Sequence, residues 1–472
     1  MRQLLKTAFF FAPLVLLTLA GANPATAHAF GARYDLPVPL SLYLIGAGAA
    51  VALSFVVATV FVRGETGAAE RLSLKLPLHL VMSSGVRWAI KLASAALFVL
   101  IIAAGLIGDQ DPYQNLAPTM VWIIWWVGMA YVSALFGNLW ALVNPWRVLF
   151  EVVERLYGVL RPGARLGFGF AYPSWLGVWP ACILFLAYAW AELVWPARAE
   201  PSSLAIIILA YSAITWGGML LFGRTAWLGG GEAFSVAFGL IARFAPLQAL
   251  GTHHLNLRLP ATGLIAGKPA QPSRMIFVLL LLSTVTFDGF KETAVWIAID
   301  NALAGGGEPG IWPVTLGLLV FPLLFMLLFL LTCRLMALAG GSGQSTVALA
   351  GLFVTSLVPI AIAYHLAHYL SFLLINGQLF IPLASDPFGF GWDLFGTAGY
   401  KADIAIVGAK FAWYTALAAI VVGHIIAVSL AHAVALKVHG DSWRAMRSQY
   451  PMLVLMVGYT IAGLWILSQP LV

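Results

Sequence analysis

Charged residues are scarce in this sequence: only 9% of its 472 residues are Asp, Glu, Lys or Arg, against about a quarter in soluble globular proteins. Hydrophobic residues make up 61% of the chain, and the mean hydropathy is +0.93. This balance excludes a soluble enzyme, a disordered tail and a nucleic-acid-binding module. Cysteine is also scarce. Cys182 and Cys333 both lie in apolar runs, which excludes a disulfide framework or zinc finger and predicts packing roles.

Long apolar runs fill much of the chain, and about 20 such residues cross the hydrocarbon core of a bilayer as a helix. The sequence therefore predicts an all-α fold, a polytopic integral membrane helical bundle with about ten transmembrane helices, whose partner is the lipid bilayer and not a nucleic acid. The expected spans are residues 40–62, 88–108, 117–143, 172–196, 204–222, 274–298, 313–333, 346–375, 404–436 and 450–468.

The segment 1–27 has the order of a secretory signal peptide: basic residues, an apolar run, then small residues up to Ala27. We expect cleavage after Ala27, which leaves a single transmembrane domain, 28–472, with an outer N-terminal segment, 28–39. His28 would then offer its amine and a ring nitrogen to one metal ion, a chelate that suits copper. The alternative is an uncleaved first helix or a nearby cleavage point, with His28 an ordinary surface residue.

Basic residues are distributed unequally between the two sides of the predicted spans. The connections on one side hold eighteen Lys or Arg, and those on the other hold three. Because excess Lys and Arg marks the cytoplasmic side, we expect a multi-pass protein of the bacterial inner membrane with both termini on the outer, periplasmic side. Two inner connections, around 146–157 and 232–246, carry apolar residues at helical spacing, which predicts helices lying at the inner interface.

Three ionisable residues interrupt the sixth span: Asp288, Lys291 and Glu292. Their spacing places them on one side of a helix, and each costs about 2.5–3.5 kcal/mol near the bilayer centre. We expect such residues to form a metal or proton site, with Asp288 or Glu292 serving as a base on metal-bound water. The alternative is a structural ion pair that holds helices together.

Histidines interrupt the eighth and ninth spans. His365 and His368 are three residues apart, so both can point into one bundle interior, and His424 lies in the middle third of the ninth span. Together with His28 they are the predicted ligands of a copper or zinc ion, with the carboxylates as further ligands or as groups that orient the imidazoles. The alternative for each is a hydrogen-bonded core histidine.

The outer connection 376–403 mixes Gly and Pro with aromatic residues, and is too apolar for a simple solvated linker. It predicts either a lid over the outer-half site or a membrane anchor at the interface. Phe388, Trp392 and Asp393 are the candidate lid residues. No motif for an organic cofactor is present.

Four segments also resemble a bacterial membrane-protein family described as fenitrothion-hydrolase-like. They begin at His28 (HAFGARYDLPVP), Phe287 (FDGF), Tyr364 (YHLAHY) and Ser385 (SDPFGFGWDLFGT). The resemblance covers most of the chain, and the last segment is its most specific part. It implies a membrane-bound, metal-dependent hydrolase of organophosphorus triesters, acting alone or with a second membrane or periplasmic subunit.

Two other functions stay open beside this hydrolase. One is a copper, other metal-ion or proton transporter, in which His424 and His432 continue a path through the ninth span. The other is a structural membrane subunit of a complex, in which the polar face only organises helices. Histidines at several depths favour transport, whereas clustering at one depth favours a fixed site.

Overall fold

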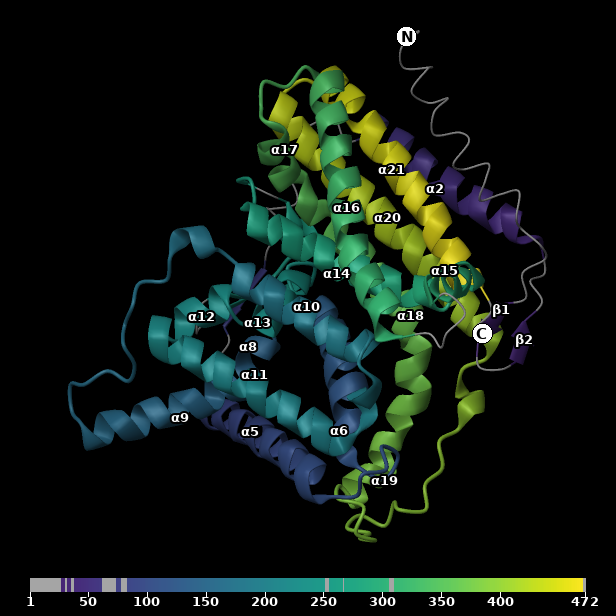
Figure 1. Ribbon diagram of the computed structural model, residues 1–472. Helices are drawn as coiled ribbons and strands as arrows, with labels where there is room; N and C mark the ends of the chain where they lie inside the picture. The colour runs from purple at the N-terminus through teal and green to yellow at the C-terminus, as the bar shows by residue number, and fades with distance from the viewer. Residues whose placement is uncertain are drawn as a thin grey trace.

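The computed structural model describes residues 27–29, 32–34, 38–61, 74–77, 83–250, 254–265, 267–304 and 310–469. Within this part, ten helical segments are long and apolar enough to cross a membrane, so the predicted all-α, multi-pass fold is confirmed (Figure 1). The predicted signal peptide lies outside the described residues, apart from Ala27. The surroundings of such a bundle are a lipid bilayer.

The ten spans are built from one or several helices each. Seven spans are single helices: α2 (Leu40–Phe61), α5 (Ser84–Ile107), α11 (Pro201–Phe222), α14 (Pro272–Lys291), α16 (Ile311–Gly340), α20 (Ala409–His439) and α21 (Ser442–Ser468). The third span consists of α6 (Leu116–Pro118), η1 (Thr119–Val127) and α7 (Gly128–Phe136), and the fourth of η2 (Ser174–Leu176) and α10 (Trp179–Leu193). The eighth span consists of α17 (Thr346–Phe353), η5 (Val354–Leu357), α18 (Val358–Asn376), η6 (Gly377–Leu379) and α19 (Phe380–Ser385).

Shorter elements connect the spans. The helices among them are α8 (Trp140–Val143), α9 (Pro145–Leu160), η3 (Pro196–Ala199), α12 (Arg224–Gly230), α13 (Ala233–Ile241), η4 (Thr262–Leu264), α15 (Ala294–Ala304) and η7 (Ile404–Ile406). The strands are β1 (Ala27–Ala29), β2 (Ala32–Tyr34), β3 (Leu74–Pro77), β4 (Leu247–Leu250) and β5 (His254–Leu257), which form an antiparallel β1–β2 pair and a three-stranded antiparallel sheet in the order β3-β5-β4.

Several predicted boundaries differ from those in the structure, and two of these differences lie in the spans that carry the candidate site. The sixth span, expected over 274–298, ends at Lys291, because the Thr293 hydroxyl accepts the backbone N–H of Trp296 at 3.3 Å and caps a separate helix, α15. The outer connection, expected from residue 376, starts as helix, because η6 and α19 prolong the eighth span to Ser385. Both expected inner-connection helices are present, as α9 and α13.

The spans form two groups that meet along α14 and α18. One group contains α2, α16, α20 and α21, and the other contains α5, α9, α10, α11, α12 and α13 (Figure 1). The α14 helix contacts α16 on one side and α10 on the other, and α18 contacts both α20 and η1. In the most apolar part of α14, and of the span containing α18, 78% of residues are buried, against 17% for α16. The helices that carry the candidate site are therefore central.

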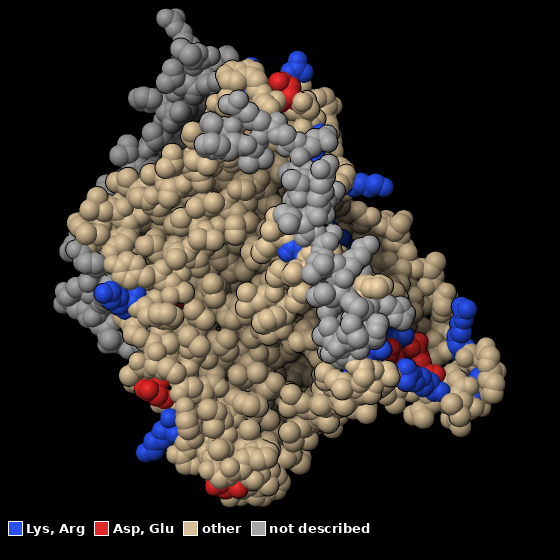
Figure 2. Space-filling model, turned by 180° about the vertical axis from the view of Figure 1, so that it is seen from behind, with Lys and Arg blue, Asp and Glu red and all other residues tan. Residues whose placement is uncertain are grey.

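The molecular surface is consistent with a position inside lipid. Figure 2 shows a broad face with few charged side chains over its middle, while most Lys, Arg, Asp and Glu side chains gather toward its margins. Many large hydrophobic side chains of the bundle are exposed, including Leu53, Leu319 and Leu327 at 63%, 46% and 64%. Apolar side chains on the outside of a bundle are the arrangement that a hydrocarbon solvent favours.

A group of ion pairs joins three helices of the second group. Glu151 of α9 accepts a hydrogen bond from Lys91 of α5 at 2.7 Å and forms an ion pair with Arg224 of α12, in which Nη1 lies 2.7 Å from Oε1. Burial alone would raise the pKa of Glu151, but these two cations outweigh it, so the pKa lies below its usual value. The ion pairs fix α9 across the ends of α5 and α12.

We expect Glu151→Gln to remove about 1 kcal/mol of stability at neutral pH, the order of a partly exposed ion pair. A carboxyl with a lowered folded-state pKa contributes stability above its unfolded-state pKa and loses it as the pH falls through the folded-state value. The difference in apparent melting temperature between the wild type and Glu151→Gln should therefore shrink on acidification below the usual range of Glu pKa values. A pH-independent difference would contradict this origin.

Candidate proton site between α14 and α18

Asp288 occupies the last turns of α14, where it faces α18. A single carboxylate oxygen, Asp288 Oδ2, accepts two hydrogen bonds: one from His368 Nε2 at 2.8 Å and one from the Tyr369 hydroxyl at 2.5 Å. Asp288 is 8% exposed. A carboxylate of the sixth span therefore pairs with a histidine of the eighth, and these two helices are neighbours at this depth.

Lys291 extends this group toward the exposed end of α14. Its ammonium lies 3.3 Å from Asp288 Oδ1 and 3.4 Å from Glu292 Oε1. The Glu292 side chain is 43% exposed, whereas the Lys291 and Asp288 side chains are 14% and 11% exposed. The three residues form a graded series from the surface to the interior, and Asp288 lies at its inner end with both oxygens bound by donors.

Gly289 is the reason that neighbouring helices approach so closely here. A Cβ atom at this position would lie 2.9 Å from Ile466 Cγ2 of α21 and 3.8 Å from His368 Nδ1 of α18. Side chains larger than glycine would push α14 away from α21, and with it move Asp288 relative to His368. The Phe-Asp-Gly-Phe segment thus places a buried carboxylate next to a glycine that lets α18 and α21 approach α14 closely.

His365 does not contact Asp288. Its ring packs against Trp126, Tyr131 and Tyr369 with centroids 5.8, 5.3 and 4.8 Å away, and the Tyr131 hydroxyl donates to the His365 carbonyl at 3.1 Å. Both ring nitrogens are buried and have no hydrogen-bond partner in the described part of the chain. His365 and His368, predicted to serve one metal together, therefore face different surroundings.

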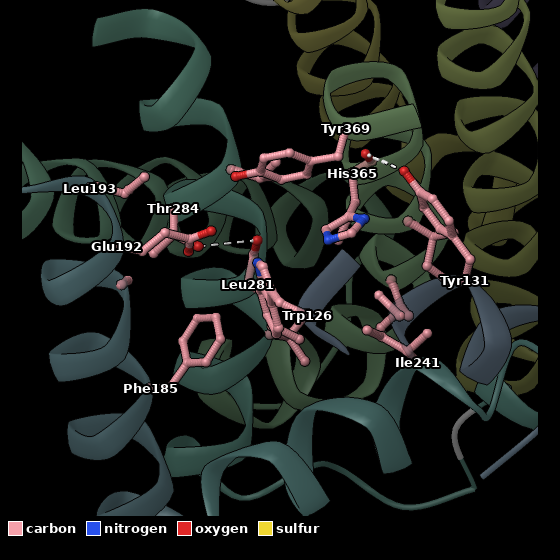
Figure 3. A pocket seen from close by; sticks show the side chains of 17 residues that line it. Trp126, Tyr131, Phe185, Glu192, Leu193, Ile241, Leu281, Thr284, His365 and Tyr369 are labelled. Carbon is pink, nitrogen blue, oxygen red and sulfur yellow. Dashed lines mark hydrogen bonds between the residues drawn. The ribbon is translucent and has the colours of Figure 1, made fainter. Parts of the chain in front are cut away.

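A small cavity of about 40 Å³ separates His365 from α10. His365 and Tyr369 line it from α18, Trp126 from η1 and Glu192 from α10 (Figure 3). In Figure 3 the hydroxyl end of Tyr369 points toward the side on which Glu192 lies. Tyr369 therefore borders the cavity while its hydroxyl is bonded to Asp288, so it connects the two places.

Glu192 is the site residue that sequence reasoning missed. It lies one residue before the end of α10, and its side chain lines the cavity. A signal for it was present, because an acidic residue stands inside the predicted fourth span among Ala191, Leu193 and Val194. The criterion that selected Asp288, a charge within an apolar run, selects Glu192 equally well.

Trp126 reaches the cavity because part of the third span is a π-helix. Residues Thr119–Val127 form η1, with wider turns than an α-helix. Within it, Trp125 and Trp126 both pack inward, on Phe234 at 4.5 Å and on Tyr188 at 5.0 Å between centroids. Apolar periodicity gave no warning of this, since the whole segment is hydrophobic.

The other predicted metal ligands lie apart from Asp288. His424 of α20 is fully buried, donates from Nδ1 to the Ile420 carbonyl at 2.8 Å, and packs near Tyr364 and Tyr459. The backbone of His28 lies in β1, which contacts α20 and α21, but its side chain is outside what the structure describes.

The predicted lid residues do not line the cavity. Phe388 and Trp392 pack on Phe390 with centroids 5.3 and 5.5 Å away, and the Phe388 carbonyl accepts the N–H of Asp109, in the turn between α5 and α6, at 2.7 Å. Asp393 accepts hydrogen bonds from the Ala398 N–H and from the Ser385 hydroxyl. Both bonds lower the pKa of Asp393, and the bond from the Ala398 N–H has the larger effect. The loop thus packs on itself and on the turn between α5 and α6.

The described residues contain no group of three or more His, Cys, Asp or Glu side chains placed to hold one metal ion. The zinc or copper site therefore stays a prediction. What the structure brings together is an acid–base group, consisting of Asp288, His368, Tyr369 and Lys291, beside a cavity that Glu192 and His365 border.

Comparison with known proteins adds no assignment. No family model, no curated protein and no solved structure matches this chain.

Proposed function

We propose that this chain is a proton-handling protein of the bacterial inner membrane, with both termini on the periplasmic side, that binds and releases protons at Asp288. The observation that supports it most is the convergence of His368 and Tyr369 on one oxygen of a buried carboxylate. Ionisable groups in central helices are costly, and in membrane proteins they mark ion and proton routes. The Lys291 and Glu292 side chains connect Asp288 to the outer surface.

The size of the cavity favours protons over a bulky substrate. Pockets for drug-sized ligands are typically about 300–1,000 Å³, whereas the cavity beside Asp288 holds about 40 Å³. An aryl phosphotriester would need a much larger space than this cavity, which Tyr369, His365 and Glu192 line. Triester hydrolysis, which rests on the family resemblance, therefore remains the second candidate, and a second subunit remains a prediction that belongs with it.

The direct test is reconstitution of the full-length chain in liposomes that contain a pH-sensitive dye. After an external pH step, proteoliposomes should equilibrate faster than protein-free liposomes, and the rate should scale with protein content. The same preparation is assayed for hydrolysis of an aryl phosphotriester and for bound metal. Hydrolysis without proton flux would replace the proposal by the hydrolase, and the absence of both would leave the structural-subunit reading.

A further inference from the structure

Three arginines gather at the end of α14 opposite to Asp288. Arg274 is the third residue of α14, Arg243 comes two residues after α13, and Arg258 directly follows β5. Partial burial lowers the pKa of Arg243, and repulsion by Arg274 and Arg258 lowers it further. Three segments that are distant in the sequence therefore bring like charges together.

The backbone of Gly263, in η4, holds two of these guanidinium groups close to each other. Arg243 Nε donates to the Gly263 carbonyl at 2.8 Å. A Cβ atom at Gly263 would lie 2.3 Å from Arg258 Cζ, so the Arg258 guanidinium packs directly on this glycine. Two cations are thus in contact with one residue, and any side chain larger than glycine would separate them.

The three arginines differ in how their N–H groups are used. Arg258 donates to the Gln248 side chain and to the carbonyls of Arg243 and Ala245, at 2.7, 2.8 and 3.2 Å, and so fixes the chain where α13 ends. Arg243 donates from Nε, while its two terminal nitrogens bond to no described residue and stay accessible. Arg274 is exposed and has no hydrogen bond or ion pair in the described part of the chain. Two guanidinium groups are therefore free to bind an anion.

The surroundings of this arginine cluster supply no counter-charge. No Asp or Glu side chain that the structure describes forms an ion pair with any of the three. The N-terminus of α14 adds the positive end of its dipole, and Gln271 provides no side-chain cap there. Leu257 and Leu259, on either side of Arg258, are 39% and 45% exposed. Cations beside exposed apolar side chains, at the end of a transmembrane helix, suit the depth of lipid headgroups, where the anions are phosphates.

We infer that Arg243 and Arg274 bind the phosphate of an anionic phospholipid at this end of α14, with Arg258 holding the Arg243 backbone in place. A planar guanidinium matches two phosphate oxygens at once. Basic pockets between transmembrane helices on the cytoplasmic side suit lipid headgroups, and the expected topology puts this end of α14 on that side. The lipid site lies apart from Asp288 and does not depend on the proposed proton function.

The test measures which phospholipid the full-length chain retains. The protein is reconstituted in vesicles of equal parts phosphatidylglycerol and phosphatidylcholine, released in mild detergent and examined by native mass spectrometry, with phosphatidylglycerol then titrated back. The wild type should retain phosphatidylglycerol in preference to phosphatidylcholine. In Arg243→Gln/Arg274→Gln the apparent Kd for phosphatidylglycerol should rise roughly 30-fold, the order expected for two basic side chains at an anionic surface. Equal retention of both lipids, or an unchanged Kd, would overturn the site.

Two further variants keep the result interpretable. Arg334→Gln is the matched control, because Arg334 is an exposed arginine near the end of α16 without an ion pair among the described residues. It should leave the Kd unchanged, and a rise equal to that of the double variant would reduce the site to general attraction by surface charge. Arg274→Gln breaks no hydrogen bond of the described fold, so it serves if the double variant fails to fold, and should raise the Kd about fivefold.

Inorganic phosphate distinguishes a lipid from a soluble ligand. Phosphatidylglycerol should stay bound when inorganic phosphate is added at the same concentration, because the acyl chains hold the lipid at the helix end. Displacement of the lipid by phosphate, lost in Arg274→Gln, would assign the arginines to a soluble phosphate and overturn the lipid site.

Discussion

Replacing Asp288 by asparagine should abolish most proton flux, lowering it by roughly 100-fold or more, the range for removal of a positioned acid or base. Asparagine keeps the shape of aspartate and can still accept hydrogen bonds from His368 and Tyr369, but it cannot take up a proton. The fold should therefore survive, with Lys291 still paired to Glu292 at the surface. The measurement is dye-reported flux in liposomes, next to an apparent melting temperature for the same protein.

Two variants make this result interpretable. Glu200→Gln removes an exposed carboxylate whose side-chain contact is with Ser203 in its own turn, and should leave the flux unchanged. His368→Gln retains a hydrogen-bond donor but lacks the imidazole ring, and should lower the flux less than Asp288→Asn does. Wild-type flux in Asp288→Asn would reject the proton site and leave the polar group a structural ion pair.

Gly463→Ala should produce the largest loss of stability among conservative changes in the bundle. A Cβ atom at Gly463 of α21 would overlap the hydroxyl of Tyr364, which donates to the Tyr459 carbonyl one turn earlier at 2.9 Å. Tyr364 is buried, so relief requires α18 to move away from α21. Overpacking of this kind costs about 1–3 kcal/mol, occasionally more, and here it would also displace the helix that carries His365 and His368.

The same helix supplies the control for this prediction. A Cβ atom at Gly458 meets nothing within 4 Å, so Gly458→Ala should leave stability unchanged or raise it slightly through helix propensity. The readout is thermal exposure of Cys182 and Cys333, both buried and unpaired, to a thiol-reactive fluorophore. Equal melting temperatures for the two alanine variants would contradict the close packing of Tyr364 on α21.

The spans show how far composition alone reaches. Runs of about 20 apolar residues are a consequence of bilayer thickness, so ten spans could be predicted without any tertiary information. The ends were less certain because local hydrogen bonds set them: Thr293 starts a new helix where hydropathy continues, and α19 prolongs a span into a segment rich in Gly and Pro. A hydropathy pattern does not contain these capping interactions.

The candidate site divides in the same way. That Asp288 and His368 are special followed from the sequence, because charge and imidazole are expensive inside a bilayer wherever they stand. That they touch, while His365 three residues away does not, depends on how α18 is rotated against α14. Sequence spacing put both histidines on one face, but the face is wide enough for one ring to meet Asp288 and the other to meet Trp126.

The sequence by itself determined that the chain lies in lipid, how many times it crosses the bilayer, and which few polar residues stand inside the spans. These properties follow from the transfer free energies of individual residues. What only the tertiary structure decided was partnership: Glu192 with the cavity, Tyr369 with Asp288, and His424 with the Ile420 carbonyl. Partnership depends on helix rotation, on the π-helix at Trp126 and on the room left by Gly289. Those are properties of packed surfaces, in which each contact exists only because its neighbours are in place.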